Sequence, residues 1–119
     1  KLDRRKKAVP GAKELKGLGG SPGVVQGTAR VVRSPDEFDQ VQPGEIMVCR
    51  LTNPAWINVF PKIKGLVTDA GGILAHPAIV SREFGIPCVV GTSIATEEIK
   101  TGDTIKVDGT KGIVELLAT

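Results

Sequence analysis

The distribution of apolar positions predicts a domain built mainly from short strands. Six runs are rich in β-branched and other apolar residues, and each is bounded by Gly, Pro or Asp-Gly, which favour turns. The first run is interrupted by Gly27, where we expect the strand to bend. The predicted strands cover residues 24–32, 45–50, 65–69, 86–91, 103–109 and 112–118.

The segments between these strands include short helices. In residues 55–64, apolar side chains recur at i, i+3, i+4 and i+7, beginning with Trp56, which we expect in the core. Residues 77–84 predict a helix that begins at Pro77 and ends at Gly85, and Pro35 opens a single helical turn. Several strands with two or three short helices predict an α/β fold, arranged as a β/β/α sandwich.

The polar start of the chain predicts a linker. Residues 1–17 are interrupted by the Pro10-Gly11 pair, so we assign them to a basic linker and residues 18–119 to one folded domain. Residues 19–23 are a Gly, Ser and Pro cluster that predicts a turn. With 119 residues and 40% apolar content, the chain can bury one core. No apolar run approaches the roughly 20 residues that cross a bilayer, so we expect a soluble, cytoplasmic protein without membrane contact.

The net charge of +3 does not indicate a nucleic-acid partner. The positive excess lies largely in KLDRRKK at residues 1–7, and the rest of the chain is nearly balanced. Three Phe, one Trp and no Tyr leave little aromatic surface on which bases could stack. Cys49 and Cys88 lie in apolar, strand-like runs, so we expect buried, reduced thiols without a chemical role.

The most informative stretch for function is GLVTDAGGILAHPAIVSREFGIPCVVGT, residues 65–92. A strand ends at Asp69, the pair Gly71-Gly72 allows a close backbone turn, and His76 stands directly before the helix that begins at Pro77. A helix N-terminus offers unpaired N–H groups, which we expect after Pro77, and the positive end of the helix dipole. Both stabilise a phosphoryl group, and the dipole favours the neutral, nucleophilic imidazole. The sequence therefore predicts that His76 attacks phosphorus and holds the product.

Simpler interpretations of this histidine exist. A lone His before a helix is by default a cap or a hydrogen-bonded surface residue. Metal binding is disfavoured because His76 is the only histidine and both cysteines are distant in sequence. Nothing indicates the partner residues of a serine-type triad. Only the whole pattern around His76 favours phosphoryl chemistry.

This pattern resembles a known family, the swivelling phosphohistidine domains of phosphoenolpyruvate-utilising enzymes. The resemblance runs through TDAGG, the histidine, AIVSRE and GIPCVVGT, and more loosely over residues 19–117. It implies that His76 is the phosphoryl acceptor, that Gly71 and Gly72 are the paired glycines before it, and that Ala78 to Arg82 form the helix after it. It also implies a swivelling β/β/α domain that moves between an ATP-grasp nucleotide-binding domain and a domain that binds phosphoenolpyruvate or another acceptor. ATP and Mg²⁺ would belong to those partner domains, with no cofactor bound here.

Two positions depart from the family's pattern. Leu74 stands where many members carry Thr, Ser or Asn, so the acceptor for regulatory phosphorylation is missing. Pro77 stands where a small residue usually follows the histidine, and it removes one N–H beside the site. These departures bear on regulation and on the substrate more than on the role of His76.

The supporting residues carry alternative interpretations. Arg82 follows His76 by about 1.7 helical turns, so it either binds phosphate or pairs with Glu83 or another carboxylate. Thr68, together with Asp69, either orients the imidazole or makes ordinary turn contacts. Both alternatives stay open at this point.

Three functions are compatible with these residues. The leading one is a domain of a phosphotransferase, in which His76 takes a phosphoryl group from ATP or phosphoenolpyruvate and passes it to a second acceptor. The second is a non-catalytic phosphocarrier or docking module that separate proteins phosphorylate in trans. The third is a structural domain without phosphorylation, against which the presence of His76 and both glycines argues.

Overall fold

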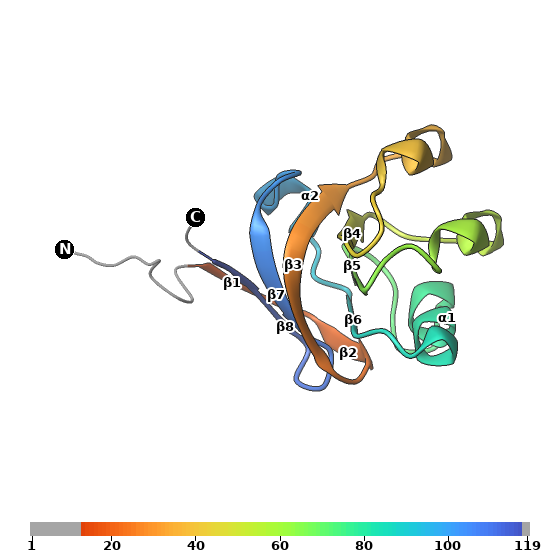
Figure 1. Cartoon of the computed structure of the whole chain (residues 1–119). Coiled ribbons are helices and arrows are strands. Elements are labelled where there is room, and N and C mark those ends of the chain that lie inside the picture. The colour runs from red at the N-terminus through yellow and green to blue at the C-terminus, as the bar shows by residue number, and fades with distance from the viewer. Residues whose placement is uncertain (1–12, 118–119) are drawn as a thin grey trace.

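The computed structural model, which describes residues 13–117, contains eight strands, two α-helices and two 3₁₀ helices. The strands form one sheet in the order β1-β8-β7-β3-β4-β5-β6-β2 (Figure 1). Along the chain, the elements are β1 (Lys13–Lys16), β2 (Leu18–Ser21), β3 (Val24–Val31), η1 (Pro35–Gln40), β4 (Ile46–Cys49), η2 (Pro54–Val59), β5 (Gly65–Thr68), α1 (His76–Phe84), β6 (Cys88–Val90), α2 (Ala95–Glu98), β7 (Thr104–Asp108) and β8 (Ile113–Leu116).

Strand β3 belongs to both halves of this sheet and joins them. Its residues 24–28 pair antiparallel with β7, and its residues 29–31 pair parallel with β4. On one side of β3 the strands β7, β8 and β1 are antiparallel. On the other side β4, β5 and β6 run parallel, with β2 antiparallel at the edge. Gly27 lies just before the change of partner, where β3 curves through the middle of the fold (Figure 1).

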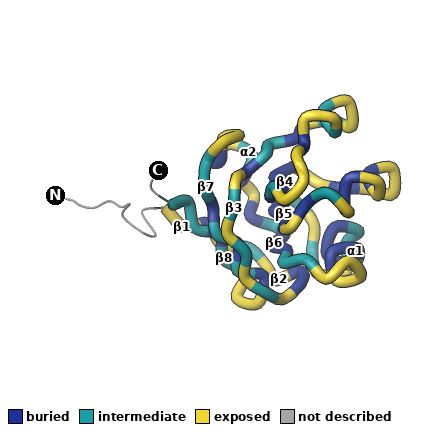
Figure 2. The backbone as a smooth tube through the Cα atoms, in the orientation of Figure 1, coloured by how far each residue is buried: buried dark blue, intermediate teal, exposed yellow. Residues whose placement is uncertain are grey.

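The parallel strands are buried on both faces, which produces three layers. In β4, Ile46 and Val48 belong to a core shared with β7, β8 and α2. Met47 and Cys49 point the other way, because successive side chains alternate, into a core shared with η2 and α1. Buried positions accordingly concentrate in the central strands and exposed positions in the loops (Figure 2). The predicted α/β fold with β/β/α layers is confirmed.

The N-terminal part of the sheet differs from the expectation. Residues 13–16 and 18–21, expected in a linker and a turn, form β1 on β8 and β2 on β6, so one segment lies along both edges of the sheet. Glycines permit this close packing. A Cβ on Gly17, between the two strands, would lie 2.4 Å from the Val90 carbonyl oxygen, and one on Gly20 would lie 3.1 Å from the Cβ of Ala78. The first twelve residues of the predicted linker lie outside the described residues.

The predicted helices are present with small changes. The segment that contains the buried Trp56 is the 3₁₀ helix η2, and α1 begins at His76, one residue before the expected start. Gly85 ends α1 in the left-handed conformation, with φ 70°, and its N–H caps the helix by donating to the carbonyls of Ser81 and Arg82, as predicted. The short helix α2 was not predicted. None of the helices within residues 13–117 is long and apolar enough to cross a membrane.

Both cysteines lie in the core between the parallel strands and α1. Each is fully buried and free of a disulfide, which confirms the expected buried thiols. Burial raises the pKa of Cys88 to about 11 and raises that of Cys49 as well, so both thiols stay protonated at neutral pH.

Candidate functional site

The imidazole of His76 lies at the junction of α1, η2 and the loop that follows β4. His76 is the first residue of α1, and Ala75 is its N-cap. The ring is half-buried and meets Phe60 edge-on, with 6.1 Å between ring centroids. Phe60 follows η2 and is itself fully buried, so one side of the imidazole rests on the core. The ring is therefore held in place at the domain surface.

A threonine that the sequence analysis did not single out binds the imidazole. The hydroxyl oxygen of Thr52 lies 2.8 Å from Nδ1 of His76. Thr52 is buried and stands between the end of β4 and Asn53, whose side chain caps η2 by accepting the Ala55 N–H at 2.9 Å. Because β4 and η2 fix both flanks of Thr52, its hydroxyl is a rigid partner for the ring. Among residues 13–117, Nε2 has no hydrogen-bonding partner.

Unpaired backbone N–H groups lie in the turn that precedes His76. Within the described part of the chain, the N–H groups of residues 71–74 and 76 make no hydrogen bond. The expected donors after Pro77 are engaged instead, since Ala78 and Ile79 both donate to the carbonyl of Ala75 at 3.1 Å. The prediction of unpaired N–H groups after Pro77 is therefore wrong, because these groups donate to a carbonyl within the first turn of α1. Gly71 supports the turn with φ 100°, which disfavours other residues.

The structure also places the remaining predicted residues. Thr68 is fully buried and donates to the carbonyl of Ala70 at 2.8 Å rather than to His76. The carboxylate of Asp69 accepts two bonds from Thr96, from the backbone N–H at 2.9 Å and from the hydroxyl at 2.5 Å, and so binds α2. Ala78 is buried against β2.

Arg82 reaches two carbonyl groups. Its guanidinium donates to Gly20 of β2 at 2.6 Å and to Ile73 of the glycine turn at 2.9 Å. No ion pair of Arg82 is formed within residues 13–117. The structure thus gives Arg82 contacts that neither of the two sequence-based interpretations described.

Burial sets the electrostatics of the imidazole. It lowers the pKa of His76 from the ordinary value of 6.5, and the negative charge of Glu83 opposes this by raising it. The net direction is downward, so the ring is neutral at physiological pH. A neutral imidazole keeps one ring nitrogen with a free lone pair, which is the nucleophilic form.

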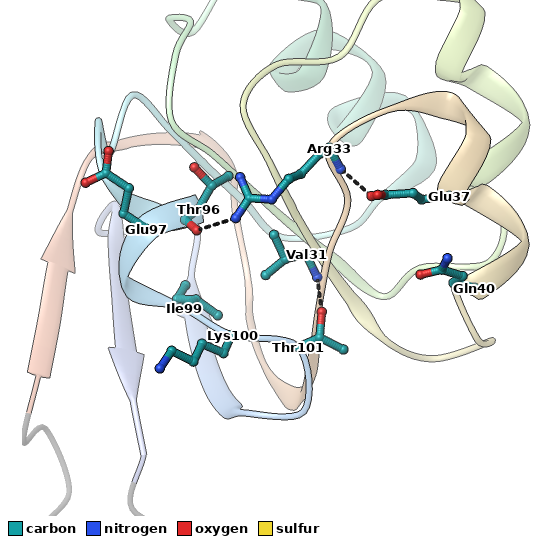
Figure 3. Close-up of a pocket in the computed structure, with 9 residues that line it drawn as sticks. All are labelled: Val31, Arg33, Glu37, Gln40, Thr96, Glu97, Ile99, Lys100 and Thr101. Carbon is teal, nitrogen blue, oxygen red and sulfur yellow. Dashed lines mark hydrogen bonds between the residues drawn. The ribbon is translucent and has the colours of Figure 1, made fainter.

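A separate groove lies away from His76. It measures about 530 Å³ and is bounded by β3, η1 and the segment around α2, and His76 does not line it (Figure 3). The side chain of Arg33 crosses it to reach the carbonyl of Thr96 at 3.3 Å. Within residues 13–117, no group of His, Cys, Asp and Glu side chains could hold a metal ion.

Fold and site together define a class, that of β/β/α domains which present one histidine at the start of a helix packed on the parallel strands. Comparison with known proteins agrees with this class. Residues 41–112 match the family model described as "PEP-utilising enzyme, mobile domain". The chain therefore belongs to the family of mobile domains of phosphoenolpyruvate-utilising enzymes.

Similar proteins include phosphoenolpyruvate synthases and phosphotransferases of much greater length. The chain is 50% identical to the phosphoenolpyruvate synthase of Pyrococcus furiosus, over 84% of this chain and 12% of that protein. It is 44% identical to the rifampicin phosphotransferase of Bacillus cereus, over 89% of this chain and 12% of that protein. The solution structure of Enzyme I (nEIt) matches with a TM-score of 0.59 and 32% identity, over 66% of this chain and 33% of that one. The domain thus belongs to an enzyme family, and the chain spans 3 to 15% of the length of eight curated relatives that it matches.

Proposed function

We propose that Nε2 of His76 carries a phosphoryl group between a donor and a second acceptor, as part of a phosphotransferase with paired acceptors. The observation that carries this proposal is the hydrogen bond between Thr52 and Nδ1 of His76. When Nδ1 keeps its proton and donates it to the Thr52 oxygen, the lone pair of the neutral ring lies on Nε2. Nε2 is also the ring nitrogen without a partner among the described residues.

The transfer step conserves the ring proton. The lone pair of Nε2 forms the N–P bond, and the bond from phosphorus to the leaving oxygen of the donor breaks, with its electron pair staying on that oxygen. The ring gains a positive charge, and its proton stays on Nδ1, which donates it to the Thr52 oxygen, beside a phosphoryl group with about two negative charges. In the second step an acceptor oxygen attacks phosphorus and the N–P bond breaks, which returns the neutral ring.

The surroundings of His76 support the phosphorylated state. The start of α1 places the positive end of the helix dipole beside the ring. The unpaired N–H groups of residues 71–74 and 76 add donors that suit phosphoryl oxygens. The negative charge of a phosphoryl group is therefore stabilised at this position.

We propose that the partners are an ATP-grasp nucleotide-binding domain, which would hold ATP and Mg²⁺, and a domain that binds phosphoenolpyruvate or another acceptor. The named relatives are long phosphotransferases in which this domain is a small part. Large apolar side chains are exposed on α1, on η2 and in the loops before these helices, with Leu74 80% exposed, and such side chains suit contact with another protein domain. These side chains are Leu51, Ile57, Ile73, Leu74, Ile79 and Phe84.

The experiment uses phosphoramidate, a small phosphoryl donor that needs no partner domain. The chain is incubated with it and its intact mass is measured before and after mild acid. We expect one acid-labile phosphoryl group on the wild type and none on His76→Ala. A wild-type chain that stays unmodified, or a mutant that is modified equally, would contradict the proposal. The matched control Thr101→Val, which changes a residue of the groove in Figure 3, should be modified like the wild type.

A further inference from the structure

The carbonyl groups of the turn before His76 are held by donors from inside the domain. The carbonyl of Ala70 accepts the Thr68 hydroxyl at 2.8 Å, that of Gly72 accepts the Ala75 N–H at 3.0 Å, and that of Ile73 accepts Arg82 at 2.9 Å. The turn therefore has several fixed peptide planes rather than a loose backbone.

Fixed carbonyls also fix the N–H groups on the opposite side of each peptide. The described residues contain no cis peptide bond, so each N–H points away from the carbonyl of the residue before it. The donors bound to Ala70 and Ile73 thereby set the directions of the N–H groups of Gly71 and Leu74. Both N–H groups lack an acceptor within residues 13–117. They are free to bind a ligand.

The guanidinium of Arg82 is itself held in place. A long helical side chain leans toward the N-terminus of its helix, which brings Arg82 back toward the turn. Its second bond, to Gly20 at 2.6 Å, ties it to β2, and β2 packs against α1 where Gly20 meets Ala78. The planar guanidinium of Arg82 thus links β2 at the edge of the sheet, α1 and the turn before His76. The ammonium group of a lysine could not make both bonds with the same geometry.

We propose, on the basis of the proposed function, that Arg82 and Thr68 are positioning residues for phosphoryl transfer. Acting through the carbonyls of Ile73 and Ala70, they aim the N–H groups of Leu74 and Gly71 at the phosphoryl group on His76. Arg82 thus acts on the backbone and is no direct ligand of the phosphate. Preorganised N–H donors of this kind stabilise charge without reorganisation during the transfer.

The test compares Arg82→Gln and Arg82→Lys with the wild type, and uses Arg33→Gln as the matched control, since Arg33 also donates to a backbone carbonyl. The phosphorylation rate with phosphoramidate is measured by ³¹P NMR over a range of donor concentrations. The amide signal of Leu74 is followed in ¹H–¹⁵N spectra before and after phosphorylation. We expect the limiting rate to fall about tenfold in Arg82→Gln and less in Arg82→Lys, from the loss of one oriented donor. Phosphorylation should shift the Leu74 amide in the wild type and in the control, but far less in Arg82→Gln.

Thr68→Val is a second, independent variant, because it keeps the shape of a buried side chain and removes only the hydroxyl. It should reduce the shift of the Gly71 amide in the same way, even if Arg82→Gln fails to fold. The inference is overturned if both variants react at the wild-type limiting rate with wild-type amide shifts. It is also overturned if Arg82→Gln weakens only the apparent affinity for phosphoramidate and leaves the Leu74 shift unchanged, as a direct phosphate ligand would. A wild-type chain that takes up no phosphoryl group would instead refute the proposed function.

Discussion

Removal of the Thr52 hydroxyl should slow the phosphorylation of His76 without unfolding the domain. In Thr52→Val the side chain keeps its size, but Nδ1 of His76 loses its partner at 2.8 Å. The proton can then move to Nε2, which takes the lone pair from the proposed nucleophile. One hydrogen bond contributes about 1 kcal/mol, which corresponds to roughly a fivefold lower rate. The same loss leaves a half-buried ring nitrogen unpaired, so the unfolding free energy should fall by about 1 kcal/mol.

The assay is the rate of phosphorylation by phosphoramidate, followed by ³¹P NMR well below the melting temperature, so that the lower stability does not change the folded fraction. Thr52→Ser retains the hydroxyl and should react at close to the wild-type rate. Thr101→Val serves as the matched control, because its hydroxyl accepts the Val31 N–H at 2.9 Å in a groove that His76 does not line. A rate for Thr52→Val equal to that of Thr52→Ser would refute the assignment of Nε2 through Thr52.

Three further predictions concern titration and packing. The His76 ring should titrate in ¹H–¹⁵N spectra with a midpoint below pH 6.5, and Glu83→Gln should lower this midpoint further. A midpoint above pH 6.5 would contradict the conclusion that burial affects the pKa of His76 more than the charge of Glu83 does. Because the pKa of His76 is lower in the folded state, the imidazole's contribution to the unfolding free energy is complete above pH 6.5 and is lost as the pH falls through the folded pKa of His76. Gly109→Ala should lower the unfolding free energy by about 3 kcal/mol in urea titrations, because the Cβ of the alanine would lie 1.8 Å from the Ser21 carbonyl oxygen of β2. A loss below about 1 kcal/mol would mean that β2 moves away from residue 109 at little cost. The bidentate pair of Arg30 and Glu45, at 2.9 and 3.0 Å, lowers the pKa of Glu45. Glu45→Gln should therefore lower the unfolding free energy by about 1 kcal/mol at pH 7, and should not change it once the pH lies below the folded pKa of the wild-type carboxyl. An equal loss of stability at both pH values would exclude the ion pair as the cause.

The strands and α1 could be predicted because their signals are local. Alternating burial in β7 and the cap at Gly85 follow from residues next to each other in sequence. Strands β1 and β2 could not be recognised in this way. The polar residues of β1 suggest a linker and the glycines of β2 suggest a turn. Gly17 and Gly20 instead serve close packing against Val90 and α1, which depends on segments about 60 to 75 residues further along the chain.

The position of His76 followed from sequence, but its hydrogen-bonding partners did not. Thr52 lies 24 residues before it and carries no motif of its own. A signal was nevertheless present, because Thr52 follows β4 and His76 follows β5, and the carboxyl ends of adjacent parallel strands meet at one edge. Thr68, next to the glycines, was the more obvious choice from sequence. Its hydroxyl instead binds the carbonyl of Ala70, two residues away, so proximity in sequence did not select the ring's partner.

The central claim is that Nε2 of His76 carries the phosphoryl group, and one spectrum tests it directly. The ¹⁵N-labelled chain is phosphorylated with phosphoramidate, and the ring nitrogens of His76 are observed in a long-range ¹H–¹⁵N spectrum. We expect the Nε2 signal to shift on phosphorylation, while Nδ1 keeps a proton that donates to Thr52. A phosphoryl group on Nδ1, or on a residue other than His76, would contradict the account.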